Sequence, residues 1–196
     1  MLFSSMFFSS GCSTLRTTDP PRTASEQFLL NEATRRSIAK LTATPLRDRL
    51  VFVDPTYSIR GEYAQNELLF MVAELRSMLL AAGARLTNDR SLADAIVEVR
   101  AVGIGIDRLE TLFGIPSVAL PSGTSANVPL LTPELAIVKR LRQKGFASIA
   151  YVAYWRNSGE IVTSSGPYVG RTEREDFWIM GFGPRTVGDI ATTKKE

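Results

Sequence analysis

Few side chains in this sequence have the chemistry of a catalytic group. The chain has 196 residues, no histidine and one cysteine, Cys12. Without histidine, the commonest general base is missing, and so is every serine or cysteine nucleophile that depends on an imidazole. A single cysteine also excludes an internal disulfide and a thiolate zinc site, and no acidic loop has calcium-binding spacing. We therefore expect no metal site and none of the frequent kinds of enzyme active site.

Three carboxylates, Glu173, Glu175 and Asp176, form the one group that could support acid–base chemistry. Two carboxylates that face a substrate can divide the roles of acid and base, as in glycoside hydrolysis. These three lie in or beside a polar stretch, residues 168–175, that we predict to be a loop. In a loop, a solvated charge cluster is the simpler interpretation, so we expect no catalytic residues.

Binding of nucleotides or nucleic acids is not indicated by the sequence either. The pairs Gly103-x-Gly105 and Gly181-x-Gly183 are incomplete phosphate-loop patterns, and neither is expected to open a helix. The net charge is only +3, and the basic residues are spread along the chain rather than gathered in a stripe. We expect no cofactor, no small-molecule substrate and no nucleic acid partner.

Cys12 is the residue whose position most clearly indicates a chemical modification. It follows an apolar run, residues 1–8, and the small residues Ser9, Ser10 and Gly11. The run Ser9-Ser10-Gly11-Cys12 resembles the lipobox of bacterial lipoproteins, which implies cleavage before Cys12 and lipid on its thiol and new amino group. It departs from that pattern because Ser9 replaces the usual Leu or Val and no basic residue precedes the apolar run. A start codon upstream of Met1 would account for the second departure.

The residues after Cys12 are typical of a spacer between an anchor and a domain. Residues 13–22 are polar and contain two consecutive prolines, so we predict an extended tether over 12–22 behind a signal peptide at 1–11. Under the sorting rules of enteric lipoproteins, Ser13 implies the periplasmic face of the outer membrane. The alternative is a cytosolic protein with an apolar N-terminus and an unmodified thiol.

The periodicity between residues 23 and 190 predicts one α/β domain, followed by a solvated tail at 191–196. Its fold class is a mixed β-sheet packed with two main helices and ending in an antiparallel hairpin or meander. The predicted helices span 23–41, which opens with the capping-box spacing Thr23–Glu26, and 62–82. The predicted strands span 50–54, 85–87, 95–106, 146–155, 160–164 and 177–182, with a turn around Asn157 to Gly159. Residues 134–143 fit either a helix or a strand.

An apolar segment rich in proline and glycine, residues 107–133, interrupts this pattern. It is too long for an ordinary connection and too apolar for a linker, so we predict an insertion that packs on the domain or serves as a contact surface. The candidate interface residues are Phe113, Ile115, Val118, Leu120, Trp155 and Trp178. Packing within the core is the alternative interpretation for the two tryptophans.

The order of these features resembles a broad group of bacterial lipoproteins. The features are the lipobox-like cysteine, the spacer, "RLVFVDP", a helix ending in "LLAAGARLTNDRSLADAIVEVRAVG" and a terminal hairpin. The group includes the curli-secretion channel lipoprotein, the Pel polysaccharide-export lipoprotein and lipoprotein activators of peptidoglycan synthases.

The resemblance implies a non-enzymatic envelope protein, tied to the membrane by lipid on Cys12. Its role would be that of an accessory or structural component of an export or assembly complex, bound to envelope proteins or to copies of itself. A monomeric lipoprotein that regulates a periplasmic enzyme is the alternative. The third alternative is an enzyme whose catalytic groups are carboxylates.

Overall fold

The computed structural model describes residues 13–15, 23–58, 65–117, 119–120, 130–131 and 134–189. The predicted signal peptide at 1–11, Cys12, Val118 and the tail at 191–196 lie outside this part of the chain. Contacts group the chain into two compact units. We call them the core unit (18–107 and 144–173) and the strand unit (1–17, 108–143 and 174–196).

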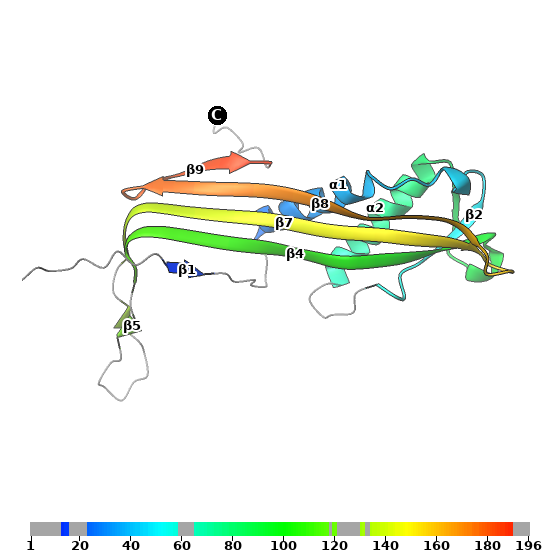
Figure 1. Cartoon of the computed structure of the whole chain (residues 1–196), viewed down its shortest axis with the longest axis horizontal. Helices are drawn as coiled ribbons and strands as arrows, with labels where there is room; N and C mark the ends of the chain where they lie inside the picture. The colour runs from blue at the N-terminus through cyan, green and yellow to red at the C-terminus, as the bar shows by residue number, and fades with distance from the viewer. Residues whose placement is uncertain are drawn as a thin grey trace, which may run out of the picture. The chain divides into compact units, whose positions relative to one another are not determined.

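The described elements form a mixed β-sheet and two α-helices, so the predicted α/β fold class is confirmed (Figure 1). The order of the main strands is β3-β2-β4-β7-β8-β9, and β1 pairs with β4. The helices are α1 (Ala24–Ile38) and α2 (Gln65–Ala81), with short 3-10 helices η1 (Thr44–Leu46) and η3 (Arg90–Leu92). The strands are β1 (Ser13–Leu15), β2 (Leu50–Asp54), β3 (Arg85–Thr87), β4 (Ala95–Ile115), β5 (Ala119–Leu120), β6 (Leu130–Leu131), β7 (Leu135–Trp155), β8 (Ile161–Ile179) and β9 (Phe182–Gly188).

The core unit is a parallel βαβ arrangement with an antiparallel hairpin added to it. Strand β2 pairs in parallel with both β3 and β4, and α2 connects β2 to β3. On α2, the side chains of Met71, Leu75 and Leu79 are fully buried. These side chains form one core with the buried valines of β2 and β4 and with the inner residues of β7. Burial of this apolar surface is the main force that holds the helices on the sheet.

Helix α1 begins as predicted and packs unusually close to the sheet. The capping box is present, because Thr23 Oγ1 accepts from the Glu26 amide at 3.3 Å and the Glu26 carboxylate accepts from the Thr23 amide at 2.9 Å. On the sheet below, a Cβ atom added to Gly170 would lie 1.8 Å from the carbonyl oxygen of Ala33. The Thr172 hydroxyl donates to the carbonyl of Leu29 at 2.8 Å. The backbone of α1 therefore rests directly on β8.

The turn between β7 and β8 is the predicted one. The Trp155 amide donates to the carbonyl of Glu160 at 2.8 Å, and Gly159 has a φ of +75°, a conformation that favours glycine. The first residues of the predicted tether differ from expectation. Ser13–Leu15 form β1, which pairs antiparallel with β4 through Ser13 and Leu112, so this part of the spacer packs on the sheet.

Three other expectations about the strands are wrong. Strand β4 continues to Ile115, so the predicted insertion at 107–133 begins within a regular strand. Residues 168–175, predicted to be a loop, belong to β8. For residues 134–143 both helix and strand were left open, and residues 135–143 belong to β7. The single strand predicted over 177–182 is interrupted by a turn at 180–181, between the ends of β8 and β9.

A buried carboxylate, Asp54, fixes the connection that leads from β3 to β4. Asp54 is 3% exposed, and its Oδ2 lies 2.5 Å from Nη1 of Arg90 in η3. Its Oδ1 accepts from the Thr56 amide at 3.0 Å and from the Thr56 hydroxyl. Burial of Asp54 acts to raise its pKa, but the hydrogen bonds from Thr56 and Arg90 outweigh that effect and hold the pKa below its usual value.

We expect Asp54→Asn to lower the free energy of unfolding by about 2 kcal/mol at pH 7, because it removes a charged acceptor from a buried pair. Since folded Asp54 has the lower pKa, its contribution is present above about pH 4, the usual unfolded value. It is lost as the pH falls through the folded pKa. Urea unfolding at several pH values should therefore show a difference between wild type and variant that shrinks below about pH 4. A difference that stays constant down to about pH 2 would contradict this explanation.

Candidate functional site

The strand unit exposes large apolar side chains on most of its strands. Phe182 is 83% exposed, Met180 72% and Ile115 61%. The other members of this apolar surface are Leu109, Phe113, Leu135, Ile137, Ile179 and Val187. Large apolar side chains that gather on an exposed part of a domain mark interaction sites. We call these nine residues the apolar surface.

The apolar surface occupies both faces of the strands. Leu109, Phe113 and Ile115 alternate along β4 with Glu110, so they lie on the face opposite to it. The ammonium group of Lys139 on β7 is 2.8 Å from Glu110 Oε1, which places Lys139 and its strand neighbour Ile137 on the Glu110 face. Both faces of this part of the sheet therefore carry exposed apolar side chains.

A groove of about 600 Å³ lies on the Glu110 face of the strand unit. The groove is lined by Leu135, Ile137, Lys139, Trp178 and Met180, among others. Trp178 is one of the predicted interface residues, and its place in this groove agrees with that prediction without testing what it binds.

The charged side chains of the strand unit are largely paired with each other. Lys139 Nζ lies 2.8 Å from Glu110 and 3.0 Å from Glu134. Arg140 donates from Nε and Nη2 to the two carboxylate oxygens of Glu175 at 2.5 and 2.8 Å. The Arg140 guanidinium holds the pKa of Glu175 below its usual value. Within each pair the positive and negative charges offset each other. We therefore expect a partner to contact this unit mainly through apolar side chains.

The three carboxylates considered for acid–base chemistry all lie on β8, where alternation puts Glu173 and Glu175 on one face and Asp176 on the other. Glu175 and Asp176 are consecutive residues of β8, so their side chains point to opposite faces of the sheet. Glu175 is held by Arg140, whereas Asp176 is buried and accepts from Arg174 at 3.2 Å and from the Thr186 hydroxyl at 2.5 Å. These contacts give both carboxylates a role in holding strands together.

The remaining predicted interface residues are separated by the fold. Phe113 and Ile115 lie on β4 of the strand unit, where both are exposed. Leu120 lies in β5, where it is paired with Leu130 of β6. Trp155 lies in the core unit at the end of β7. The sequence-based prediction missed Leu135, Ile137, Met180, Phe182 and Val187.

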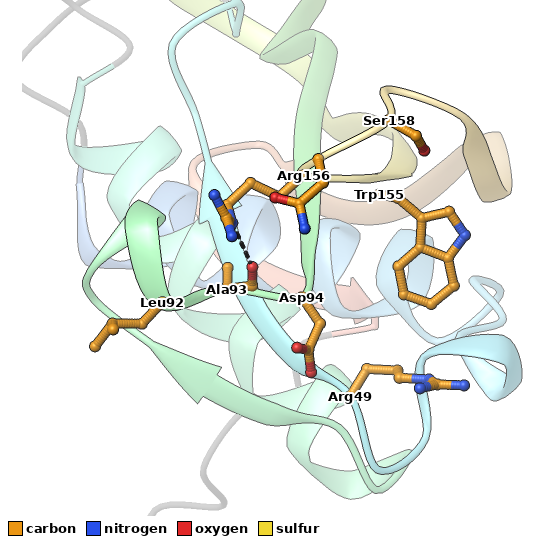
Figure 2. Close-up of a pocket in the computed structure, with 8 residues that line it drawn as sticks. Arg49, Leu92, Ala93, Asp94, Trp155, Arg156 and Ser158 are labelled. Atoms are coloured by element: carbon orange, nitrogen blue, oxygen red, sulfur yellow. Dashed lines mark hydrogen bonds between the residues drawn. The ribbon is translucent and has the colours of Figure 1, made fainter.

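A second pocket, of about 370 Å³, lies in the core unit where β2 begins and β7 ends (Figure 2). Arg49 stands beside the indole of Trp155, with its guanidinium carbon 5.2 Å from the ring centroid. Arg156 Nε donates to the carbonyl of Ala93 at 2.8 Å, the dashed line in Figure 2. Asp94 lines the same pocket, and its Oδ2 accepts from the Leu50 amide at 2.8 Å. Both arginines were missed because nothing in the sequence pattern connects them.

Among the described residues, no group of three or more acidic or sulfur-bearing side chains is arranged to hold a metal ion. No helix within the described ranges is both long and apolar enough to cross a membrane.

Together, the fold and its surfaces define an α/β protein with a mixed sheet that exposes apolar side chains on the strands of the strand unit. The chain belongs to the DUF6655 family, a family of unknown function, whose model matches residues 9–194. No curated protein sequence matches the chain.

Proposed function

We propose that this chain is a non-enzymatic, lipid-anchored protein of the cell envelope and a structural or accessory component of an export or assembly complex. The observation that carries the proposal is the apolar surface of the strand unit. Nine large apolar residues there are between 43% and 83% exposed, and they lie on or next to β4, β7, β8 and β9. A surface of this kind is stabilised when a partner removes it from water.

The position of Cys12 relates the apolar surface to the membrane. Cys12 directly precedes Ser13, which pairs with Leu112 of β4. Consecutive Cα atoms are only about 3.8 Å apart, so lipid carried by Cys12 would attach beside the strand that contains Phe113 and Ile115. An anchor there holds the apolar surface close to the membrane and to other proteins anchored in it.

The partner that the strand unit fits best is a second copy of this chain. Strand β9 is the last strand in the order of the sheet and carries Phe182 and Val187. An edge strand of this kind can pair with a strand of another chain through its backbone. Lys139 and Arg140 are each paired with a carboxylate of the same chain. This pairing lowers the electrostatic repulsion between two identical surfaces.

Native mass tests this proposal. We expect the full chain carrying Cys12→Ser, which has no lipid, to form a defined oligomer in light scattering and native mass spectrometry. Phe182→Asp should convert the oligomer to a monomer, because it places a charge in the buried contact. Leu69→Asp is the matched control, since Leu69 is 69% exposed on α2 in the core unit. A wild-type monomer at high concentration would contradict self-association and favour the alternative, a monomeric regulator of a periplasmic enzyme.

A further inference from the structure

We infer that the pocket between Arg49, Trp155 and Arg156 binds the phosphate group of a phosphate ester. This site is separate from the apolar surface and does not depend on the proposed function. The pocket lies within the core unit, where the amino end of β2 and the turn after β7 meet.

Both arginines are held in place by contacts that leave donors available. The Arg156 amide donates to the carbonyl of Asp94 at 3.1 Å, and its Nε donates to Ala93, so both backbone and side chain are fixed. Its two terminal nitrogens carry further N–H groups. The Arg49 guanidinium is positioned by the ring of Trp155 rather than by a carboxylate. Within the described part of the chain, neither guanidinium forms an ion pair.

The charges that line the pocket favour an anion. Arg49 and Arg156 contribute two positive charges and Asp94 one negative charge, so the lining carries +1. Asp94 already accepts from the Leu50 amide, which occupies part of its carboxylate. Asn157 adds a neutral amide donor at the same opening. An anion in the pocket would meet a positively charged lining, whereas a cation would meet two guanidinium groups.

Phosphate fits this arrangement better than a carboxylate does. The donors come from two separate segments, Arg49 before β2 and Arg156 with Asn157 after β7. A tetrahedral phosphate presents oxygens in several directions, and guanidinium groups bind phosphate through paired N–H donors. The indole of Trp155 forms an apolar wall beside these donors, suited to the organic part of an ester.

The indole N–H signals of the two tryptophans provide the test. We would titrate the ¹⁵N-labelled full chain carrying Cys12→Ser with inorganic phosphate and with glycerol 3-phosphate, at an ionic strength held constant with chloride. We expect a saturable shift of the Trp155 indole signal, whereas the Trp178 signal in the strand unit stays in place. Assignment follows from the signal that disappears in Trp155→Phe.

Three arginine variants separate the site from general charge effects. We expect Arg49→Gln and Arg156→Gln each to weaken phosphate binding at least tenfold, because each removes a charged donor. Arg49→Gln leaves the Arg156–Ala93 hydrogen bond intact, so it tests the site even if Arg156→Gln lowers stability. Arg100→Gln is the matched control, since Arg100 is exposed on β4 and does not line the pocket.

Vesicles distinguish the two sources from which the phosphate group could come. Sedimentation with phosphatidylglycerol but not phosphatidylcholine vesicles, lost in Arg49→Gln, would assign the site to a lipid headgroup. Binding of glycerol 3-phosphate without vesicle binding would assign it to a soluble ester. A Trp155 shift no larger than that caused by chloride, or equal binding by wild type, Arg49→Gln and Arg156→Gln, would overturn the inference.

Discussion

Replacement of Gly170 by alanine is expected to lower the free energy of unfolding by about 3 kcal/mol, the upper end of the usual cost of overpacking a well-packed site. The added Cβ would lie 1.8 Å from the carbonyl oxygen of Ala33 and 2.7 Å from the amide nitrogen of Ser37. Both atoms belong to the backbone of α1, so no side-chain rotation relieves the clash. The helix must move away from β8 and lose the hydrogen bond from Ser37 Oγ to the carbonyl of Tyr168, which is 2.6 Å long.

Two other glycines give a graded comparison in urea unfolding. A Cβ on Gly145 would lie 2.5 Å from Thr172 Oγ1 and 3.0 Å from the carbonyl of Leu29, so Gly145→Ala should cost less than Gly170→Ala. A Cβ on Gly105 would meet no atom within 4 Å, and Gly105→Ala should leave stability nearly unchanged. A Gly170→Ala variant as stable as Gly105→Ala would show that the backbone of α1 does not rest directly on β8.

The elements that the sequence predicted well are those specified by local signals. The start of α1 depends on Thr23 and Glu26, which contact each other within one turn. Strand β2 is a short apolar run ended by Asp54, and the turn after Trp155 contains Gly159 at a positive φ. Each signal lies within a few residues of the structure it specifies, so no knowledge of the tertiary fold was needed.

The elements that were missed depend on partners far away in the sequence. Residues 168–175 contain arginines and glutamates and therefore resemble a loop, but in β8 the charge of Glu175 is offset by Arg140 on β7. The segment 134–143 gave no clear pattern because an apolar run, residues 135–138, is followed by the charged residues Lys139 and Arg140. In the structure Lys139 is paired with Glu110 on β4. Cross-strand ion pairs stabilise strands whose composition alone does not favour a strand.

The candidate sites were predictable to different degrees. Phe113, Ile115 and Trp178, which the sequence indicated as interface candidates, are exposed or line the groove, and whether they bind a partner stays a prediction. The arginine pocket was not predictable. Arg49 and Arg156 lie far apart in the sequence, and only the meeting of β2, β4 and β7 in one sheet brings them together.

The largest functional effect is expected from Cys12→Ser. Serine keeps the size of the side chain but cannot form the thioether that carries diacylglycerol in lipoproteins of the kind this N-terminus resembles. We expect complete loss of lipid from the protein and its loss from the outer-membrane fraction, because no other cysteine can replace Cys12. Thr17→Ser is the matched control, a similarly small change outside the lipobox-like run, and should keep both the lipid and the fractionation of wild type.

The measurement that tests the central claim most directly is metabolic labelling with an alkyne fatty acid. The gene, with the codons upstream of Met1, would be expressed in a diderm bacterium as wild type and as Cys12→Ser, followed by intact mass and membrane fractionation. We expect labelled wild-type protein that begins at Cys12 and fractionates with the outer membrane, and no label on Cys12→Ser. An unlabelled, uncleaved wild-type protein in the soluble fraction would contradict the lipid anchor. It would favour the alternative, a cytosolic protein with an unmodified thiol.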